Sequence, residues 1–164
     1  MSQKPILIFG YGNPSRADDA LGPEYLSQLE TERDEGTLPP VFDTLTDFQL
    51  QIEHALDLEA RSLVLFVDAS GTAQPPFEFN RLTARQDNSY TTHAMSPASV
   101  LAVFNQISNH TAPSAFLLSI AGYDFELGRP LSNRAEKNLE AALEFTRKLL
   151  NHAEPDTWQE LADK

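Results

Sequence analysis

The chain has 164 residues and a mass of 18.2 kDa, the size of one compact domain, and 41% hydrophobic residues are too many for a disordered chain. Its 24 acidic and 12 basic residues leave a net charge of −12, which repels phosphate backbones and anionic lipids, so we expect neither a nucleic-acid nor a membrane partner. The lack of cysteine excludes disulfides and thiolate chemistry and leaves carboxylate and imidazole as the strong metal ligands.

The first half of the chain alternates predicted strands and helices. Residues 5–10 form a short apolar run closed by Gly10, which predicts a strand buried on both faces. This run is much shorter than a signal peptide core or a membrane span, so we expect a cytoplasmic protein. A turn-rich loop then leads into a helix from Leu21 to Leu29, a short strand at 41–42 and a helix over 48–58.

The second half continues this alternation. Residues 62–68 are predicted as a central strand, 77–82 as a half-buried edge strand and 115–122 as a further buried strand. Ser96 and Pro97 begin one helix, and Ser132 begins a long helix that ends near Leu150. We therefore expect an α/β three-layer sandwich with a central, mostly parallel, twisted sheet of about five strands and helices on both faces. Residues 1–152 form a single domain in this prediction, and the acidic residues 153–164 form a tail or short helix anchored by Trp158.

Candidate functional residues follow the carboxyl ends of the predicted strands, where parallel sheets bind ligands. They are Asn13, Asp18 and Asp19 after the first strand, Asp43 after the second, Asp68 at the end of the central strand, and His93 before the Ser96 helix. We expect Asp19, Asp68 and His93 to converge on a divalent ion such as nickel or zinc, while Asp18 caps the loop or pairs with Arg16. Alternatively, Asp19 and Asp68 share one proton as an aspartic dyad.

Other chemistries have weaker support. Gly10 and Gly12 begin a dinucleotide-binding pattern, but Ser15 replaces its third glycine and the acidic pair would repel a pyrophosphate. A serine triad lacks the Gly-x-Ser-x-Gly turn that exposes the nucleophile. The remaining histidines, His54, His110 and His152, are predicted to be solvated side chains.

Several motifs together resemble the hydrogenase maturation endopeptidases. These motifs are residues 6–13 (ILIFGYGN), 16–22 (RADDALG), 66–70 (FVDAS), Thr92-His93 and Ser96-Pro97, and the likeness extends from about Ile6 to Leu150. The family removes a C-terminal extension from the large-subunit precursor of nickel-iron hydrogenases after nickel insertion. The resemblance implies that Asp19, Asp68 and His93 contact the metal, that Asp19 and Asp68 are the catalytic candidates, and that Gly10, Gly12, Asn13 and Asp18 form the supporting loop.

The resemblance also implies the cofactor and the partner. Nickel would be supplied by or shared with the substrate, although the isolated protein could bind another divalent ion, and the partner would be the large-subunit precursor. Ala20 departs from the family pattern, which usually has glycine there, and the tail after Ala153 matches no motif. Gln49-Leu50 with Glu53, and residues 120–128 followed by 131–132, resemble the branch that serves cytoplasmic, cofactor-reducing hydrogenases. The alternative is a noncatalytic nickel-checking or carrier protein that uses the same three ligands.

Overall fold

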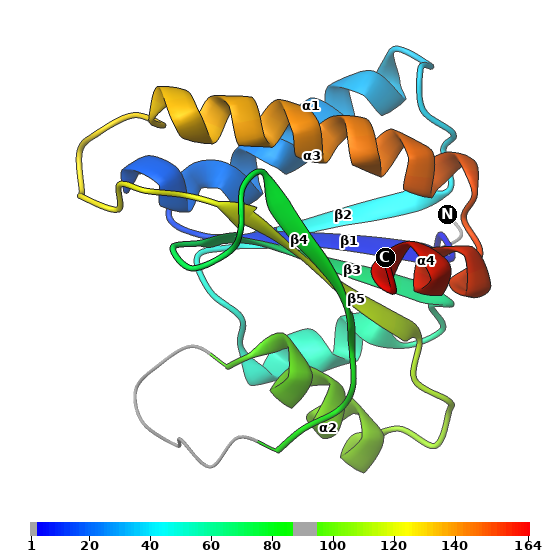
Figure 1. Cartoon of the computed structure of the whole chain (residues 1–164). Coiled ribbons are helices and arrows are strands. Elements are labelled where there is room, and N and C mark those ends of the chain that lie inside the picture. The colour runs from blue at the N-terminus through cyan, green and yellow to red at the C-terminus, as the bar shows by residue number, and fades with distance from the viewer. Residues whose placement is uncertain (1–2, 87–94) are drawn as a thin grey trace.

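Five strands form one sheet in the order β2-β1-β3-β5-β4 in the computed structural model, which describes residues 3–86 and 95–164 (Figure 1). The strands are β1 (Ile6–Tyr11), β2 (Phe42–Asp47), β3 (Leu63–Ser70), β4 (Phe77–Leu82) and β5 (Ser114–Ala121). All neighbouring strands are parallel except β4 and β5. The predicted α/β fold is confirmed, and the 77–82 strand lies at the edge of the sheet as expected.

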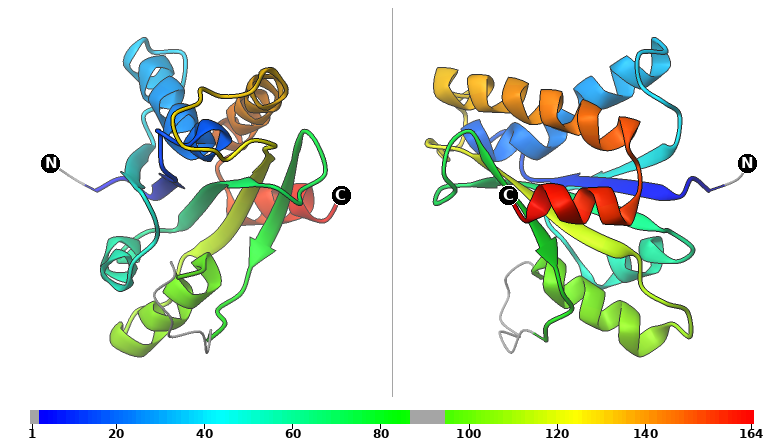
Figure 2. Two further views of the ribbon diagram at one scale, coloured as in Figure 1. Left: turned by 90° about the vertical axis from the view of Figure 1, so that its left-hand side faces the viewer. Right: turned by 45° about the vertical axis from the view of Figure 1, so that its right-hand side comes forward.

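Helices cover both faces of the sheet (Figure 2). The helices are α1 (Leu21–Asp34), α2 (Pro97–Ile107), α3 (Asn133–Asn151) and α4 (Pro155–Ala162), with the 3-10 helices η1 (Ala17–Ala20) and η2 (Ile52–Leu58). One face packs against α1, α3 and α4, and the other packs against η2 and α2. None of the helices in the described ranges is long and apolar enough to cross a membrane.

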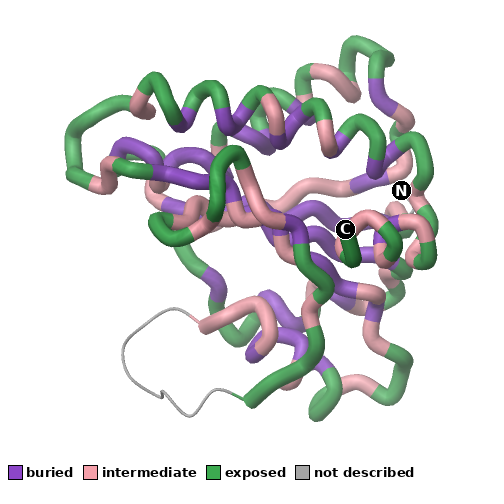
Figure 3. Tube along the Cα trace, in the orientation of Figure 1, coloured by how far each residue is buried: buried purple, intermediate pink, exposed green. Residues whose placement is uncertain are grey.

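The alternation of side chains along β1 explains the two cores. Ile6 and Ile8 point into the cluster under α1 and α3, whereas Leu7 and Phe9 point into the cluster under η2 and α2. Every residue of β1 is buried, and the buried stretches of the chain concentrate in the sheet in Figure 3. The sheet is therefore a rigid platform from which loops leave at the carboxyl ends of the strands.

Two helices begin where the sequence predicts. The Ser96 hydroxyl accepts a hydrogen bond from the Ser99 amide, and the Ser132 hydroxyl accepts one from the Ala135 amide. Each hydroxyl satisfies an amide that has no partner within its helix. The acidic C-terminal segment forms α4, whose Trp158 is fully buried against the core.

The segment between α1 and β3 differs from the prediction. The second strand extends through Asp47 rather than ending at 42, and the following helix begins at Ile52 rather than 48. Phe42 and Leu45 are the two apolar residues among the six of β2, and burial of this strand is incomplete. The continuous apolar run that marks the inner strands is therefore missing. As a result Asp43 lies at the amino end of β2, not near the carboxyl end as predicted.

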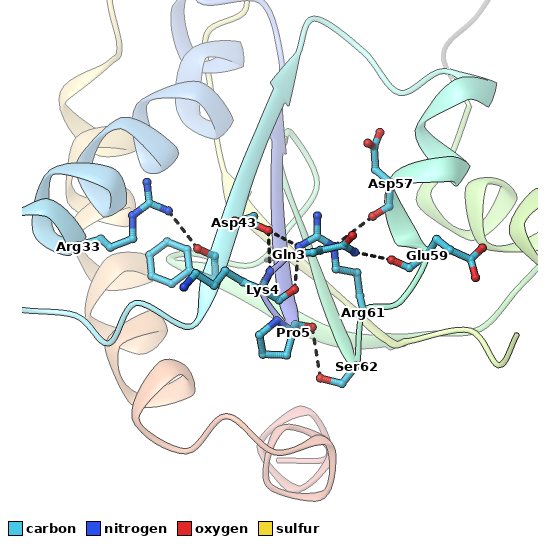
Figure 4. A network of polar contacts seen from close by, with 10 residues as sticks. Gln3, Lys4, Pro5, Arg33, Asp43, Asp57, Glu59, Arg61 and Ser62 are labelled. Atoms are coloured by element: carbon cyan, nitrogen blue, oxygen red, sulfur yellow. Dashed lines mark hydrogen bonds and ion pairs between the residues drawn. The ribbon is translucent and has the colours of Figure 1, made fainter. Parts of the chain in front are cut away.

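Asp43 belongs to a polar network at the amino ends of β1, β2 and β3 (Figure 4). Its carboxylate forms an ion pair with Arg61 and accepts a hydrogen bond of 3.0 Å from the Lys4 amide. Arg61 also donates to the Lys4 carbonyl oxygen at 2.8 Å. This network ties the ends of three strands together on the side of the sheet opposite to the carboxyl ends.

Candidate active site

Asp19 and Asp68 line one open pocket at the carboxyl ends of β1, β2 and β3. The pocket has a volume of about 630 Å³. Its lining residues are Tyr11, Gly12, Asn13, Arg16, Asp19, Asp47, Phe48, Gln49, Gln51 and Asp68. The two carboxylates come from different elements, since Asp19 belongs to η1 and Asp68 to β3. The fold thus brings together two of the three residues that the sequence singles out.

Glycines allow the loop after β1 to hold Asp19 in place. The backbone of Gly12 has φ of +147°, and a Cβ at this position would lie 2.1 Å from the Asp19 carbonyl oxygen. A Cβ on Gly10 would lie 2.6 Å from the carbonyl oxygen of Gly22 in α1. The Asn13 amide then donates a 2.8 Å hydrogen bond to Asp19 Oδ2. The glycine pattern therefore serves close packing of η1 and α1 against β1.

Asp68 has an unusually basic carboxylate. Burial and the negative charge of Asp19 raise its pKa to about 7, although hydrogen bonds from the Tyr11 side chain and the Ala69 backbone oppose the rise. Burial and the neighbouring Asp68 also hold the pKa of the Tyr11 phenol well above its usual value, so the phenol stays protonated. A group with a pKa near neutrality can both give and accept a proton, and a bound cation would favour its ionised form.

Asp18 is fully buried and faces away from the pocket. Its carboxylate accepts hydrogen bonds from the amides of Tyr123, Asp124 and Ser132 at 2.7, 3.1 and 2.7 Å, and from the Ser132 hydroxyl at 2.8 Å. Burial alone would raise its pKa, but these hydrogen bonds lower it. Asp18 therefore fastens η1 to the loop between β5 and α3, and Arg16 is not among these partners.

Solved structures of known proteins share this architecture. The chain superposes on the hydrogenase maturation protease HycI from Thermococcus kodakarensis with a TM-score of 0.66 and 20% identity, covering 92% of this chain and 94% of that one. For the hydrogenase maturating endopeptidase HybD from E. coli the TM-score is 0.68 at 23% identity, covering 90% and 93%. A hydrogenase 2 maturation peptidase from a Thaumarchaeota archaeon gives 0.63 at 23% identity, covering 90% and 98%.

The chain shares its fold with these solved hydrogenase maturation proteases. No model of a protein family matches the sequence, and neither does any curated protein. The likeness to the hydrogenase maturation proteases therefore lies in the arrangement of the whole chain, with coverage of nine-tenths or more on both sides of each comparison above.

Within this hydrogenase maturation protease fold, the third predicted metal ligand is not placed. His93 lies outside the described residues. Within the ranges 3–86 and 95–164, no group of three His, Cys, Asp or Glu side chains is close enough to hold a metal ion. Asp19 and Asp68 place carboxylate groups in the pocket lining, and a metal ion bound there would need a further ligand from elsewhere, including from a bound substrate.

Three further residues lie in or beside the pocket: Tyr11 and Asp47 line it, and His54 contacts Asp47. None of the three was predicted from the sequence as a site residue. Asp47 lines the pocket because β2 continues to that residue. His54 is buried rather than solvated as predicted. Its Nδ1 accepts a 2.8 Å hydrogen bond from the Gln51 amide, and its Nε2 lies 3.2 Å from Asp47 Oδ2. A prediction of β2 through Asp47 would have placed this residue at the carboxyl end of a strand, and so among the candidates. No local sequence signal could have found His54, because its position depends on tertiary packing against Phe9.

Proposed function

We propose that this protein is an endopeptidase that removes the C-terminal extension of a nickel-iron hydrogenase large-subunit precursor after nickel insertion, and that it recognises the bound nickel. The observation that carries this proposal is the open pocket with Asp19 and Asp68, located at the carboxyl edge of the sheet in the hydrogenase maturation protease fold. The order of the sequence motifs around these two residues supports the same function.

The two carboxylates suit recognition of a cation that the substrate carries. Asp68 lies close enough to Asp19 for that negative charge to raise its pKa, so a divalent ion between them would remove an existing repulsion. In this proposal nickel is cargo of the precursor, and Asp19, Asp68 and His93 complete its coordination when the precursor docks. Cleavage thereby depends on completed metal insertion, because only a loaded precursor presents the ion.

Hydrolysis of the peptide bond needs an attacking water and a proton for the leaving amine. The water oxygen forms a bond to the carbonyl carbon, the C–N bond breaks, and one water proton reaches the departing nitrogen. Where Asp68 is not bound to the ion, its pKa of about 7 suits it to take that proton and return it. Where Asp19 and Asp68 both hold the nickel of the docked precursor, the ion would supply Lewis-acid polarisation of the carbonyl group. Both routes require Asp68, and both use docking to fix the scissile bond beside it.

Cleavage of a nickel-loaded precursor tests the proposal. Purified protein is incubated with the loaded precursor, and loss of a C-terminal peptide is followed by mass spectrometry. We expect processing by the wild type and a decrease of at least about 100-fold in Asp19→Asn and Asp68→Asn, because each change removes a charge from the site. Circular dichroism checks that both variants fold. Processing at the wild-type rate in both variants would refute the site assignment.

One result of the same assay would favour the alternative function. If the wild type binds the loaded precursor but leaves its C-terminus intact, the protein is a noncatalytic nickel-checking or carrier protein. The proposal also places the protein in the cytoplasm, and cell fractionation followed by detection of the chain tests this location.

A further inference from the structure

An exposed apolar surface borders the candidate active site. Among the described residues, six large apolar side chains are exposed, and three of them, Phe48, Ile52 and Leu56, fall within nine consecutive residues. Their exposed fractions are 66%, 57% and 66%. Phe48 also lines the pocket that contains Asp19 and Asp68, and Ile52 and Leu56 belong to η2, which begins four residues later in the chain. We call Phe48, Ile52 and Leu56 the η2 ridge.

Folding does not explain why the η2 ridge is apolar. The same segment already buries Leu50, Ala55 and Leu58 in the core beneath η2 and α2. The ridge residues are exposed instead, and each exposed large apolar side chain forgoes about 1.5–3 kcal/mol that burial would supply. Clustered apolar side chains on an otherwise polar surface mark a place where another molecule binds.

Acidic residues are interspersed with the η2 ridge in the sequence. Residues 47–59 include four carboxylates, from Asp47, Glu53, Asp57 and Glu59, and no lysine or arginine. Asp47 faces His54, and Glu59 is bonded to His110 and Ser108. No ion pair among the described residues involves the carboxylates of Glu53 or Asp57. A partner that covers the ridge would therefore gain from lysine or arginine side chains at its rim.

We infer that the η2 ridge is the docking surface for an apolar patch, flanked by lysine and arginine, on the folded body of the precursor. This inference rests on the proposed function and names the partner chemistry of the same site. Continuity with the pocket means that a protein bound there would deliver its C-terminal segment to Asp19 and Asp68. A second copy of this chain fits less well, because two acidic rims would then face each other.

Two variants with matched controls test the inference on the full chain with the nickel-loaded precursor. The first variant, the double change Ile52→Ser with Leu56→Ser, removes apolar surface from the ridge. Its control is Ile107→Ser, which changes a similarly exposed residue at the far end of the 11-residue α2. Glu53→Lys reverses charge beside the ridge, and Glu140→Lys makes the same change on α3, across the sheet. None of these positions lines the pocket.

We expect the double variant and Glu53→Lys to raise KM for the precursor by about tenfold or more, with kcat within about twofold of the wild type. Neither control changes KM. An unchanged KM in the ridge variants, or an equal rise in the controls, would overturn the inference. Unfolding curves in urea accompany each variant, and the single change Leu56→Ser replaces the double variant if that protein does not fold.

The assay separates failure of the inference from failure of the proposed function. If the wild type does not cleave the precursor, the proposed function fails, and the dissociation constant of the precursor on immobilised protein then tests the ridge. Weaker binding by the ridge variants alone supports the docking surface without catalysis, whereas no binding by the wild type overturns it. Sedimentation of the wild type as a dimer that the double variant loses would also overturn it, in favour of a second copy.

Discussion

Asp18 and Asp19 are neighbours in the chain, but their carboxylates have different surroundings. Asp19 lines the pocket and, within the described ranges, its carboxylate accepts one hydrogen bond, from the Asn13 amide. Asp18 is fully buried and accepts four, three of them from amides of the loop that leads to α3. At the scale of single residues, the acidic pair divides into one group for ligand binding and one group that holds the structure around it.

Replacing Asp18 should therefore destabilise the protein much more than replacing Asp19. The change Asp18→Ala leaves three amides and a hydroxyl without their buried acceptor, and we expect a loss of about 3 kcal/mol or more in the free energy of unfolding. For Asp19→Ala we expect about 1 kcal/mol, because the change removes the hydrogen bond from the Asn13 amide at the border of an open pocket. Urea denaturation at pH 7 measures both values. Equal losses would contradict the assignment of Asp18 as a structural anchor.

Asp43 predicts a dependence of stability on pH. Partial burial opposes its ionisation, but the hydrogen bond from Arg61, the Lys4 amide and the charges of both residues outweigh it and lower its pKa. A carboxylate whose pKa is lower in the folded state stabilises fully above its unfolded pKa of about 3.9 and loses this contribution as the pH falls through the folded value.

The measurement is the free energy of unfolding of wild type and Asp43→Asn between pH 6 and pH 2.5. We expect the wild type to be more stable at pH 6 and the difference to shrink below about pH 4. Parallel curves over this range would show that the ion pair with Arg61 does not contribute.

At the scale of elements, α4 has one fully buried side chain, Trp158, while Leu161 and Ala162 pack partly buried against the same core. Trp158 is fully buried, packs edge-on to Phe79 and Phe116 with ring centroids 6.4 and 5.5 Å away, and donates a 2.9 Å hydrogen bond to the Leu149 carbonyl oxygen. The acidic end of the chain, which matches no family motif, is thus joined to the sheet edge and to α3.

Truncating this side chain should release α4. We expect Trp158→Ala to cost about 3–5 kcal/mol of unfolding free energy, since it empties a large buried site. Trp158→Phe keeps an aromatic ring and loses the hydrogen bond, for which we expect about 1–2 kcal/mol. The exposed Glu160 on the same helix provides the control, and Glu160→Ala should stay within about 0.5 kcal/mol of the wild type. A similar effect of all three changes on urea denaturation would contradict the anchoring role of Trp158.

The success of sequence-based prediction differed among elements for physical reasons. Inner strands such as β1 and β3 have continuous apolar runs, and the caps at Ser96 and Ser132 are local signals, so these elements were predictable. The edge strand β2 has no such run, so the predicted strand was too short and Asp47, at the carboxyl end of β2, was not predicted as a site residue. His54 is buried because it packs against Phe9 and lies beside Asp47. Phe9 is far from His54 in the sequence, and the predicted second strand did not include Asp47.

At the scale of the whole molecule, the sheet places the candidate site at the carboxyl ends of its parallel strands and the Asp43 network at their amino ends. Residues from β1, η1, β2 and β3 meet in the pocket, although Tyr11 and Asp68 are 57 positions apart in the chain. The exposed η2 ridge adjoins this edge. A large folded substrate can thus contact the ridge and place its C-terminal segment in the pocket at the same time.

In the proposed function, cleavage depends on nickel in the substrate. The most direct measurement is the intact mass of one cognate large-subunit precursor, prepared with and without nickel and incubated side by side with the wild-type protein. We predict loss of a C-terminal peptide from the nickel-loaded precursor and an unchanged mass for the nickel-free one. Equal cleavage of both forms, or an intact C-terminus on precursor whose nickel content has been verified, would contradict the proposed function.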